Sequence, residues 1–396
     1  MTILAAQYLE TVPIGATPKD VKLRLRQAFE RQPISLILLG WCLPTKLEEE
    51  VAKEASRHGA NLFRWQPWLT GDTHTDLPNE WLTIGLDGSP IPGHNDSPDF
   101  TFICPNQNGV VDFLHERLEN IASLGIYQGV FLDRIRFPSP AKNPLTHLGC
   151  FCKYCTQLAA DEGLDMASVR QYIYTNATDT KGAIKLVRML LGQSEDNNLL
   201  DSFLGFRCQS ITRIVNNAKH QADSLGLSLG LDCFSPSLAY MVGQDLHTLN
   251  NCSDWIKLMI YPRVLGPAGL PYELTNIIMW LINHGTPEDE ALRIIFEKIG
   301  LKIPETLAEV QLPNLDQKTM ENEILLGRKF GITNLFAGVA MVNMKGIHWA
   351  TPDQIRRDLL AAQLADGLVI SWDLWQTPLE HLDLMRSIME KQDGIE

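Results

Sequence analysis

The chain lacks both an excess of positive charge and long apolar runs. Its 396 residues include 34 lysines and arginines but 47 aspartates and glutamates, a formal net charge of −13. Such a surface repels nucleic-acid backbones and anionic lipid heads, so we expect neither as a partner, and it favours a neutral or cationic substrate. No apolar run reaches the roughly 20 residues that span a bilayer. The N-terminus lacks a basic segment followed by a long apolar core, so we expect no secretory signal and a cytoplasmic protein.

The sequence also has no internal repeat, no low-complexity tract and no Gly-x-Gly-x-x-Gly motif after an expected strand. The missing glycine motif argues against a dinucleotide-binding sheet. Short apolar runs instead alternate with long amphipathic stretches, a pattern typical of parallel sheets. We expect eight strands, at residues 34–41, 61–67, 100–104, 129–133, 228–234, 255–261, 333–340 and 367–372.

Helices are expected after most of these strands. Thr17 and Thr351, each followed by proline, predict helix starts, because threonine caps a helix and proline fits its first turn. The segments 157–226 and 265–330 predict helical insertions after strands four and six. The fold class that follows is α/β, a single (β/α)8 TIM barrel over residues 1–396. An open doubly wound sheet is the alternative.

Active sites of such barrels lie at the carboxyl ends of the strands. The residues expected there are three carboxylates with a set of arginines and aromatic rings. Aromatic faces stack on sugars, and arginines bind hydroxyls or carboxylates, so this combination predicts a carbohydrate site. Singly, these aspartates and tryptophans could also be ion-pair or core residues. The candidates are Asp133, Asp232 and Asp373, with Trp41, Arg64, Trp65, Arg136, Tyr261, Arg263, Trp372 and Trp375.

Paired carboxylates are what glycosidic bond cleavage requires, one as acid and the other as nucleophile or base. We expect Asp133 to pair with Asp232, with Asp373 as a third candidate. Carboxyl groups ~5–5.5 Å apart would predict retention of anomeric configuration, and ~6.5–9.5 Å would predict inversion. Two alternatives remain open: a sugar or uronate lyase or isomerase, and a barrel that binds carbohydrate without catalysis.

Three of the eight cysteines, Cys150, Cys152 and Cys155, fall within six residues. This spacing predicts thiolates on a metal in a reducing compartment rather than disulfides. The fourth ligand is Cys104 or His147, and Cys104 is favoured because it ends an expected neighbouring strand. Four thiolates form a closed, structural zinc site. An iron–sulfur cluster or unligated buried cysteines are the alternatives. The other cysteines are expected in the core: Cys42, Cys208, Cys233 and Cys252.

These motifs resemble those of the family-42 glycoside hydrolases, the microbial β-galactosidases. The shared features are the Cys-Pro-Asn turn at 104–106 and the cysteine cluster at 150–155. Residues 129–138 also resemble the Asp-x-Ile-Arg-Phe-Pro strand of glycosyl-hydrolase-like barrels. The resemblance covers residues 100–160. It implies that the four cysteines bind Zn²⁺ beside the active site and that the protein forms a homo-oligomer, the trimer of that family.

The chain departs from that family at its catalytic positions. The family carries an Asn-Glu pair at the end of strand four and a glutamate on strand seven. Here strand four ends in Asp133, and residues 335–341 contain no carboxylate. The two-glutamate mechanism is therefore not transferred, and neither is the galactoside specificity.

Overall fold

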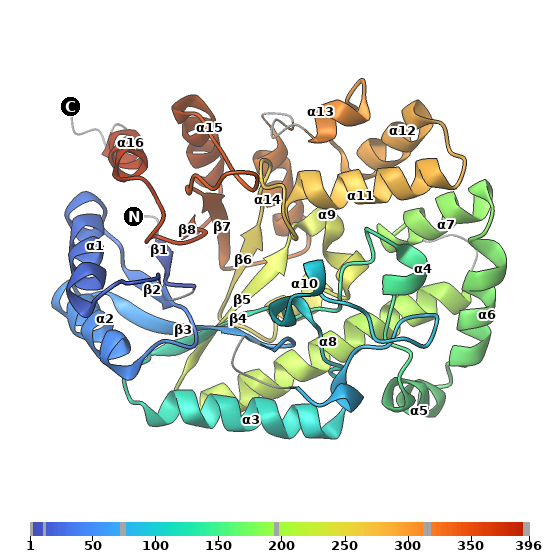
Figure 1. The fold of residues 1–396 in the computed structure, drawn as a ribbon, viewed down its shortest axis with the longest axis horizontal. Coiled ribbons are helices and arrows are strands. Elements are labelled where there is room, and N and C mark those ends of the chain that lie inside the picture. The colour runs from blue at the N-terminus through green and yellow to red at the C-terminus, as the bar shows by residue number, and fades with distance from the viewer. Residues whose placement is uncertain are drawn as a thin grey trace.

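The computed structural model describes residues 3–10, 13–71, 77–193, 198–311, 315 and 318–390. Its centre is a closed barrel of eight parallel strands, in which each strand pairs with its neighbours in sequence and the last pairs with the first (Figure 1). The predicted (β/α)8 fold is thereby confirmed. The strands are β1 (Ile3–Tyr8), β2 (Leu36–Leu39), β3 (Asn61–Pro67), β4 (Gly129–Asp133), β5 (Ser228–Phe234), β6 (Trp255–Met259), β7 (Leu335–Ala340) and β8 (Gly367–Ser371).

Two of the strand predictions are wrong. The first strand is β1, which the sequence interpretation missed, so the run at 34–41 supplies the second strand. Residues 100–104 form no barrel strand: Phe102 and Ile103 make only isolated antiparallel bridges to Thr70 and Leu82, within the long segment that follows β3. A parallel barrel strand needs a crossover connection, usually a helix, before it. Only single 3-10 turns occur in the described residues between β3 and residue 100.

The helices around the barrel begin where the capping residues predict. Thr17 and Thr351 each accept a hydrogen bond from the backbone three residues on, in a full capping box. The helices are α1 (Pro18–Arg31), α2 (Thr45–Arg57), α3 (Asn108–Ser123), α4 (Pro144–His147), α5 (Lys153–Asp161), α6 (Met166–Asn176), α7 (Thr180–Leu190), α8 (Asn198–Ser224), α9 (Pro236–Ala239), α10 (Leu246–Asn250), α11 (Leu270–Asn283), α12 (Glu288–Ile299), α13 (Leu307–Gln311), α14 (Thr319–Lys329), α15 (Pro352–Ala362) and α16 (Leu379–Glu390), with 3-10 turns η1 (Asn79–Trp81), η2 (His94–Asp96), η3 (Pro98–Phe100) and η4 (Tyr240–Val242).

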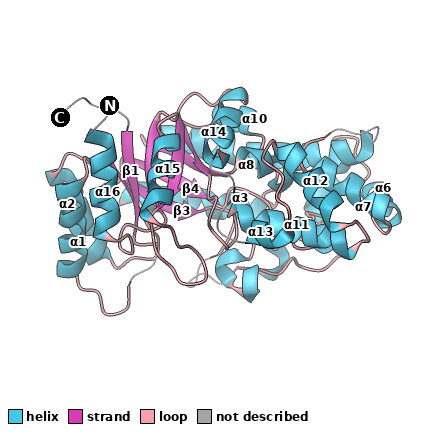
Figure 2. Cartoon of the chain, turned by 90° about the horizontal axis from the view of Figure 1, so that it is seen from above, coloured by secondary structure: helices cyan, strands magenta, loops and turns pink. Residues whose placement is uncertain are grey.

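The two segments predicted as helical insertions lie together on one side of the barrel. The segment 157–226, after β4, contains the second half of α5 and all of α6 to α8, and the segment 265–330, after β6, contains α11 to α14. Helix α7 packs against α11 and α12, so the insertions extend the molecule away from the strands (Figures 1 and 2). None of the helices in the described part of the chain combines the length and apolar character needed to cross a membrane.

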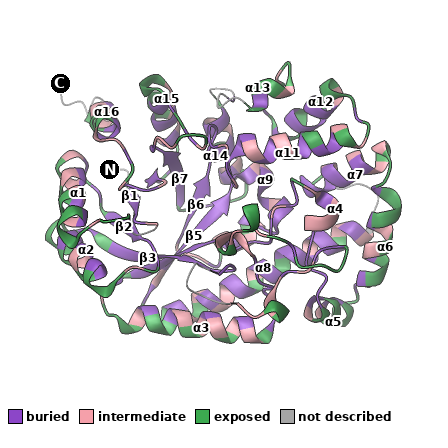
Figure 3. Cartoon of the chain, viewed as in Figure 1, coloured by how far each residue is buried: buried purple, intermediate pink, exposed green. Residues whose placement is uncertain are grey.

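The barrel is filled by its own aromatic side chains. Trp255 stacks on Phe131 with ring centroids 5.0 Å apart, and Phe336 lies 4.7 Å away. Two glycines make room for these rings: a Cβ on Gly230 would lie 2.2 Å from Trp255, and one on Gly367 would lie 2.3 Å from Phe336. The strands are buried on both faces, and the exposed surface belongs to helices and loops (Figure 3). This packed interior leaves only the carboxyl ends of the strands for a site.

Candidate active site

A small cavity of about 60 Å³ lies at the carboxyl ends of the strands, which we call the barrel mouth. Its walls come from β1, β3, β4, β5, β6 and β8 or the loops that follow them. Its lining residues are Gln7, Glu10, Trp65, Phe100, Asp133, Arg134, Arg136, Asp232, Met259, Tyr261, Pro267, Ala268 and Trp372. Six of the eleven predicted strand-end residues therefore meet here: Trp65, Asp133, Arg136, Asp232, Tyr261 and Trp372.

Asp133 is the last residue of β4, and both of its carboxylate oxygens accept hydrogen bonds. Oδ2 accepts one from Trp65 Nε1 at 3.2 Å, and Oδ1 accepts one from the backbone N–H of Arg134 at 2.6 Å. The second contact uses a left-handed backbone at Arg134, with φ +55°. One donor is a side chain of β3 and the other is the backbone of the next residue. The carboxylate is therefore held in one orientation at the barrel mouth.

Asp232 on β5 belongs to a buried network that reaches across the barrel. Lys257 Nζ on β6 lies 2.9 Å from Asp232 Oδ2, and donates to Gln7 Oε1 at 3.0 Å and to Tyr261 Oη at 2.8 Å. Burial alone would lower the pKa of Lys257, but the Asp232 carboxylate and the Tyr261 hydroxyl raise it above its ordinary value. The ammonium is therefore charged and fixes the position of Asp232.

The other oxygen of Asp232 has no such partner. Oδ1 is buried and accepts no hydrogen bond from the described residues, although the residue lines the cavity. Burial raises the pKa of Asp232 to about 7, against the opposing effect of Lys257. A carboxyl group that is partly protonated near neutral pH and belongs to a residue lining a cavity is suited to donate a proton to a ligand.

Glu10 is a carboxylate of the barrel mouth that sequence reasoning missed. It follows β1, lines the cavity and lies 3.7 Å from Arg134 Nη2. Burial, with smaller contributions from Asp133 and Asp373, raises the pKa of Glu10 to about 7, against the opposing effect of Arg134. The signal was present, since an apolar run at 3–9 ends in a carboxylate, but this run was not identified as a strand. Gln7 and Lys257 were missed because both lie within the strands rather than at their ends.

The structure places Asp373 outside the cavity. Its Oδ1 accepts hydrogen bonds from the backbone N–H groups of Leu9 and Trp375, each at 2.9 Å. It thereby joins the segment after β8 to the segment after β1. Burial raises the pKa of Asp373 to about 6, although both N–H donors oppose this.

The three predicted arginines have different surroundings. Arg64 lies outside the barrel, where it donates to Gly40 O and pairs with Glu48. Arg263 pairs with Asp358 of α15 and does not line the cavity. Arg136 alone lines the barrel mouth.

The four predicted tryptophans also separate. Trp65 and Trp372 line the cavity, and Trp372 stacks parallel to Tyr261 with ring centroids 6.3 Å apart. Trp41 packs edge-on against Trp65 behind the wall, and Trp375 packs against the main hydrophobic core. The cavity is therefore lined by aromatic rings from β3 and from the segment after β8.

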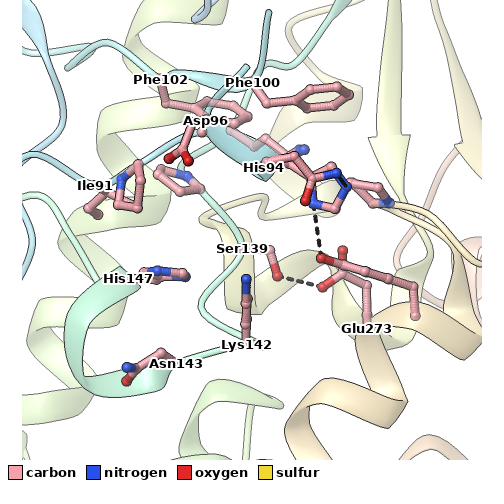
Figure 4. A pocket seen from close by; sticks show the side chains of 17 residues that line it. Ile91, His94, Asp96, Phe100, Phe102, Ser139, Lys142, Asn143, His147 and Glu273 are labelled. Carbon is pink, nitrogen blue, oxygen red and sulfur yellow. Dashed lines mark hydrogen bonds between the residues drawn. The ribbon is translucent and has the colours of Figure 1, made fainter. Parts of the chain in front are cut away.

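Figure 4 shows a larger pocket of about 420 Å³, which we call the outer pocket. The two cavities share Phe100, Arg136 and Pro267 as lining residues, so they are separated by a common wall. The outer pocket is formed by the segment before α3, by the loop after β4 and by the start of α11. Its remaining lining residues are Ile91, Pro92, Gly93, His94, Asn95, Asp96, Phe102, Pro138, Ser139, Lys142, Asn143, His147, Tyr272 and Glu273.

The four predicted cysteine ligands form one buried cluster. The sulfurs of Cys104, Cys150, Cys152 and Cys155 all lie within 4.8 Å of one another, and Cys104 Sγ is 3.4 Å from Cys155 Sγ and 3.5 Å from Cys152 Sγ. A tetrahedral metal with bonds of about 2.3 Å places its sulfurs about 3.8 Å apart. The cluster could therefore hold a metal ion. His147, the alternative ligand, lines the outer pocket instead.

Neighbouring N–H groups point at the cluster sulfurs. Ile84 N lies 3.4 Å from Cys150 Sγ, and Asn106 Nδ2 lies 3.3 Å from Cys155 Sγ. Such donors stabilise thiolates around a metal. Asn106 Nδ2 also donates to Ser210 Oγ of α8 at 2.9 Å. The cluster thus joins the loop before α3, the loop after β4 and α8, two of which border the outer pocket.

No protein-family model matches the chain, and neither does any curated protein. Among solved structures it is similar to the β-galactosidase of the psychrophilic Marinomonas ef1, with 10% identity, a TM-score of 0.57, and coverage of 100% of this chain and 61% of that one. The β-galactosidase of the Antarctic haloarchaeon Halorubrum lacusprofundi gives 9% identity, a TM-score of 0.58, and coverage of 98% and 58%. The α-L-fucosidase isoenzyme 2 of Paenibacillus thiaminolyticus gives 12% identity and a TM-score of 0.51. The match covers 99% of this chain and 49% of the fucosidase. The chain thus spans about 60% of the length of the two β-galactosidases, and at these identities the similarity establishes the barrel fold alone.

Proposed function

We propose that this protein is a glycoside hydrolase-like enzyme that cleaves a glycosidic bond at the barrel mouth. The observation that carries the proposal is that Asp232, whose buried Oδ1 has no partner among the described residues, lines the same cavity as Asp133. Two carboxylates in one aromatic-lined cavity are the minimum that glycosidic cleavage requires. The solved structures of similar fold include β-galactosidases and an α-L-fucosidase, which agrees with this class of reaction.

In this proposal Asp232 is the general acid. Its pKa of about 7 leaves it partly protonated at neutral pH, and Lys257 fixes the oxygen that does not face the ligand. The acid donates its proton to the leaving oxygen as the glycosidic bond breaks. Asp133, whose carboxylate is oriented by two N–H donors, either attacks the anomeric carbon or removes a proton from the attacking water. Glu10, beside Arg134, is a further candidate for the second role.

Around these carboxylates, Trp65 and Trp372 would stack on the sugar and Arg136 would bind its polar groups. We assign Asp373, Arg64, Arg263, Trp41 and Trp375 to positioning of the loops that form the mouth, because none of them lines the cavity and each packs against or bonds to another residue.

A mass-spectrometric turnover screen in isotopically labelled water tests the proposal. Hydrolysis of an oligosaccharide or aryl glycoside incorporates one labelled oxygen into the product, and this is the expected result. A product of unchanged mass would indicate an isomerase, and a new C=C bond without labelled oxygen would indicate a lyase. Binding of sugars without turnover of any of them would leave a carbohydrate-binding barrel.

We further propose that the cysteine cluster holds zinc, as in the family-42 enzymes whose cysteine pattern it resembles. Four thiolates leave no open position on the metal, so this site would be structural. Elemental analysis of purified protein should find near-stoichiometric zinc that Cys152→Ser abolishes, while Cys252→Ser, a cysteine outside the cluster, retains it. A stably folded, metal-free wild-type protein would contradict the assignment.

A further inference from the structure

The outer pocket differs in charge from the rest of the molecule. The chain carries a net charge of −13, yet this pocket contains Arg136 and Lys142, and its walls also carry His94 and His147. The lysine and the two histidines come from the segments before α3 and after β4, which face each other across the pocket (Figure 4). A general preference for neutral or cationic substrates, which the net charge suggests, therefore does not apply to this pocket.

Arg136 is buried where the two cavities meet, and most of its donors are unused. Its guanidinium packs 4.5 Å from the ring of Phe102 and 4.7 Å from the ring of Phe234. Among the described residues its one hydrogen bond is from Nη1 to Phe137 O at 3.1 Å, and it forms no ion pair. A buried arginine normally pairs with an anion, because burying its charge unpaired is costly. Burial lowers the pKa of Arg136 only to about 10, so it remains charged.

The charge of Glu273 acts on Arg136 and opposes the lowering of its pKa, but no ion pair joins these two residues. Glu273 uses both of its oxygens within the protein: Oε2 accepts from Ser139 Oγ at 2.6 Å, and Oε1 accepts from Ala268 N at 2.9 Å. Burial also raises the pKa of Glu273, although Ser139, Ala268 and Arg136 lower it. Asp96, which also lines the pocket, is exposed to solvent.

Lys142 provides the second positive charge. It is an exposed residue of the otherwise largely buried loop after β4, points into the pocket and has no ion-pair partner in the described part of the chain (Figure 4). The half-buried His147 and His94 lie near enough that Lys142, after burial, lowers the pKa of each. Both histidines are therefore neutral at pH 7 and provide hydrogen-bonding groups rather than charge. His94 Nδ1 lies 3.1 Å from Tyr272 Oη, which fixes one side of the pocket.

We propose that the outer pocket binds the carboxylate-bearing unit of an acidic glycan, a hexuronic acid, adjacent to the unit that is cleaved. This inference rests on the proposed glycosidase function. A planar guanidinium with free donors matches a carboxylate in a two-point contact, and Lys142 adds a point charge. Phe100, Phe102 and Tyr272 give the apolar faces that a sugar ring packs against. The volume of about 420 Å³ falls within the range of about 300–1,000 Å³ for small-ligand sites.

Equilibrium binding by calorimetry, without turnover, tests the inference. The probes are glucuronic and galacturonic acids and their short oligomers, their neutral counterparts glucose and galactose, and glucose 6-phosphate. Wild-type protein should bind each acid more tightly than its neutral counterpart. Lys142→Met should weaken binding of the acids by roughly tenfold, the effect expected for loss of a charge-assisted contact, and leave the neutral sugars unchanged.

The matched control is Lys181→Met, which removes an exposed lysine of α7 outside the outer pocket and should change nothing. Lys142→Arg should restore binding of the acids. Arg136→Lys keeps the charge but loses the two-point geometry. It should weaken binding of the acids further, provided that circular dichroism shows the variant to be folded. If Arg136→Lys does not fold, the Lys142 variants and their Lys181→Met control still test the inference.

Equal affinity for acids and neutral sugars, or an effect of Lys142→Met no larger than that of Lys181→Met, would overturn the inference. Tighter binding of glucose 6-phosphate than of the uronic acids would overturn the assignment of a carboxylate ligand, and would assign the pocket to phosphorylated sugars. The function and the inference fail separately: hydrolysis of neutral glycans that is indifferent to Lys142 removes the inference alone. Uronate binding without hydrolysis of any glycan removes the proposed function alone.

Discussion

The ends of β5 and β8 both carry a buried aspartate, but the surroundings of the two carboxyl groups differ. Asp232 of β5 has one oxygen tied to Lys257 and one without a partner at a cavity. Asp373, just after β8, uses one oxygen to accept two backbone N–H groups, and lies outside the cavity. A strand-end position therefore brings a carboxylate near the barrel mouth, whereas its hydrogen-bond partners determine whether it faces a ligand or joins two loops.

The largest expected difference between the two residues is in turnover. Asp232→Asn should lower kcat by about 10²- to 10⁴-fold, the usual contribution of a general acid, and Asp133→Asn by a similar factor. Asp373→Asn keeps an oxygen that accepts from Leu9 and Trp375, so its kcat should stay within a few-fold of wild type. Steady-state kinetics on folded variants measures this. An equally large loss in Asp373→Asn would show that the two carboxylates are not functionally distinct.

The next effect concerns the pH dependence of stability. The pKa of Asp373 is about 6 in the folded protein, above its ordinary value of 3.8, so the folded state binds the proton more tightly. Its contribution to stability is complete below pH 4 and is lost as the pH rises from about 4 to about 6. Asp373→Asn removes this loss, so relative to wild type it should gain roughly 3 kcal/mol between pH 4 and pH 7.

Urea denaturation of both proteins at the two pH values measures that gain. Thr377→Ser, which changes a neighbouring buried side chain without changing its hydroxyl, serves as the control and should show no pH-dependent difference. A stability difference between Asp373→Asn and wild type that is the same at both pH values would mean that Asp373 titrates normally.

The smallest effect separates two tryptophans near the end of β8. Both pack against the main hydrophobic core, but Trp372 also lines the cavity and stacks on Tyr261, whereas Trp375 does not line it. Trp372→Ala should raise KM by several-fold to about tenfold, because it removes an aromatic stacking face. Trp375→Ala should leave KM unchanged and lower the melting temperature instead. A similar KM increase in both variants would place the substrate across the whole β8 edge rather than in the cavity.

Sequence reasoning was most successful where the information is local. The spacing of Cys150, Cys152 and Cys155 within one turn of chain predicted that they lie together, and all three do. Cys104 was also correctly chosen, but for a wrong reason, since 100–104 is not a barrel strand. It reaches the cluster because the loop before α3 folds back beside the loop after β4, and no local pattern encodes that approach.

The barrel itself was predictable because seven of its strands are apolar runs separated by helical segments. The candidate site was less predictable from the sequence. Missing β1 hid Glu10 and Gln7, and side-chain direction along a strand decided which residues face the cavity. On β3, Arg64 points outside the barrel and its neighbour Trp65 points inside, as the alternation of a strand requires. The outer pocket brings together three segments remote in sequence, so its charge could not be read from any one of them.

The measurement that tests the central claim most directly compares leaving groups in the Asp232→Asn variant. A general acid is needed when the leaving oxygen is a poor one, such as a sugar hydroxyl, and is not needed when a dinitrophenolate departs. Asp232→Asn should therefore lose turnover of the natural glycan while it still cleaves the matching dinitrophenyl glycoside at close to the wild-type rate. Loss of both activities to the same extent, or of neither, would contradict the assignment of Asp232 as the acid at the barrel mouth.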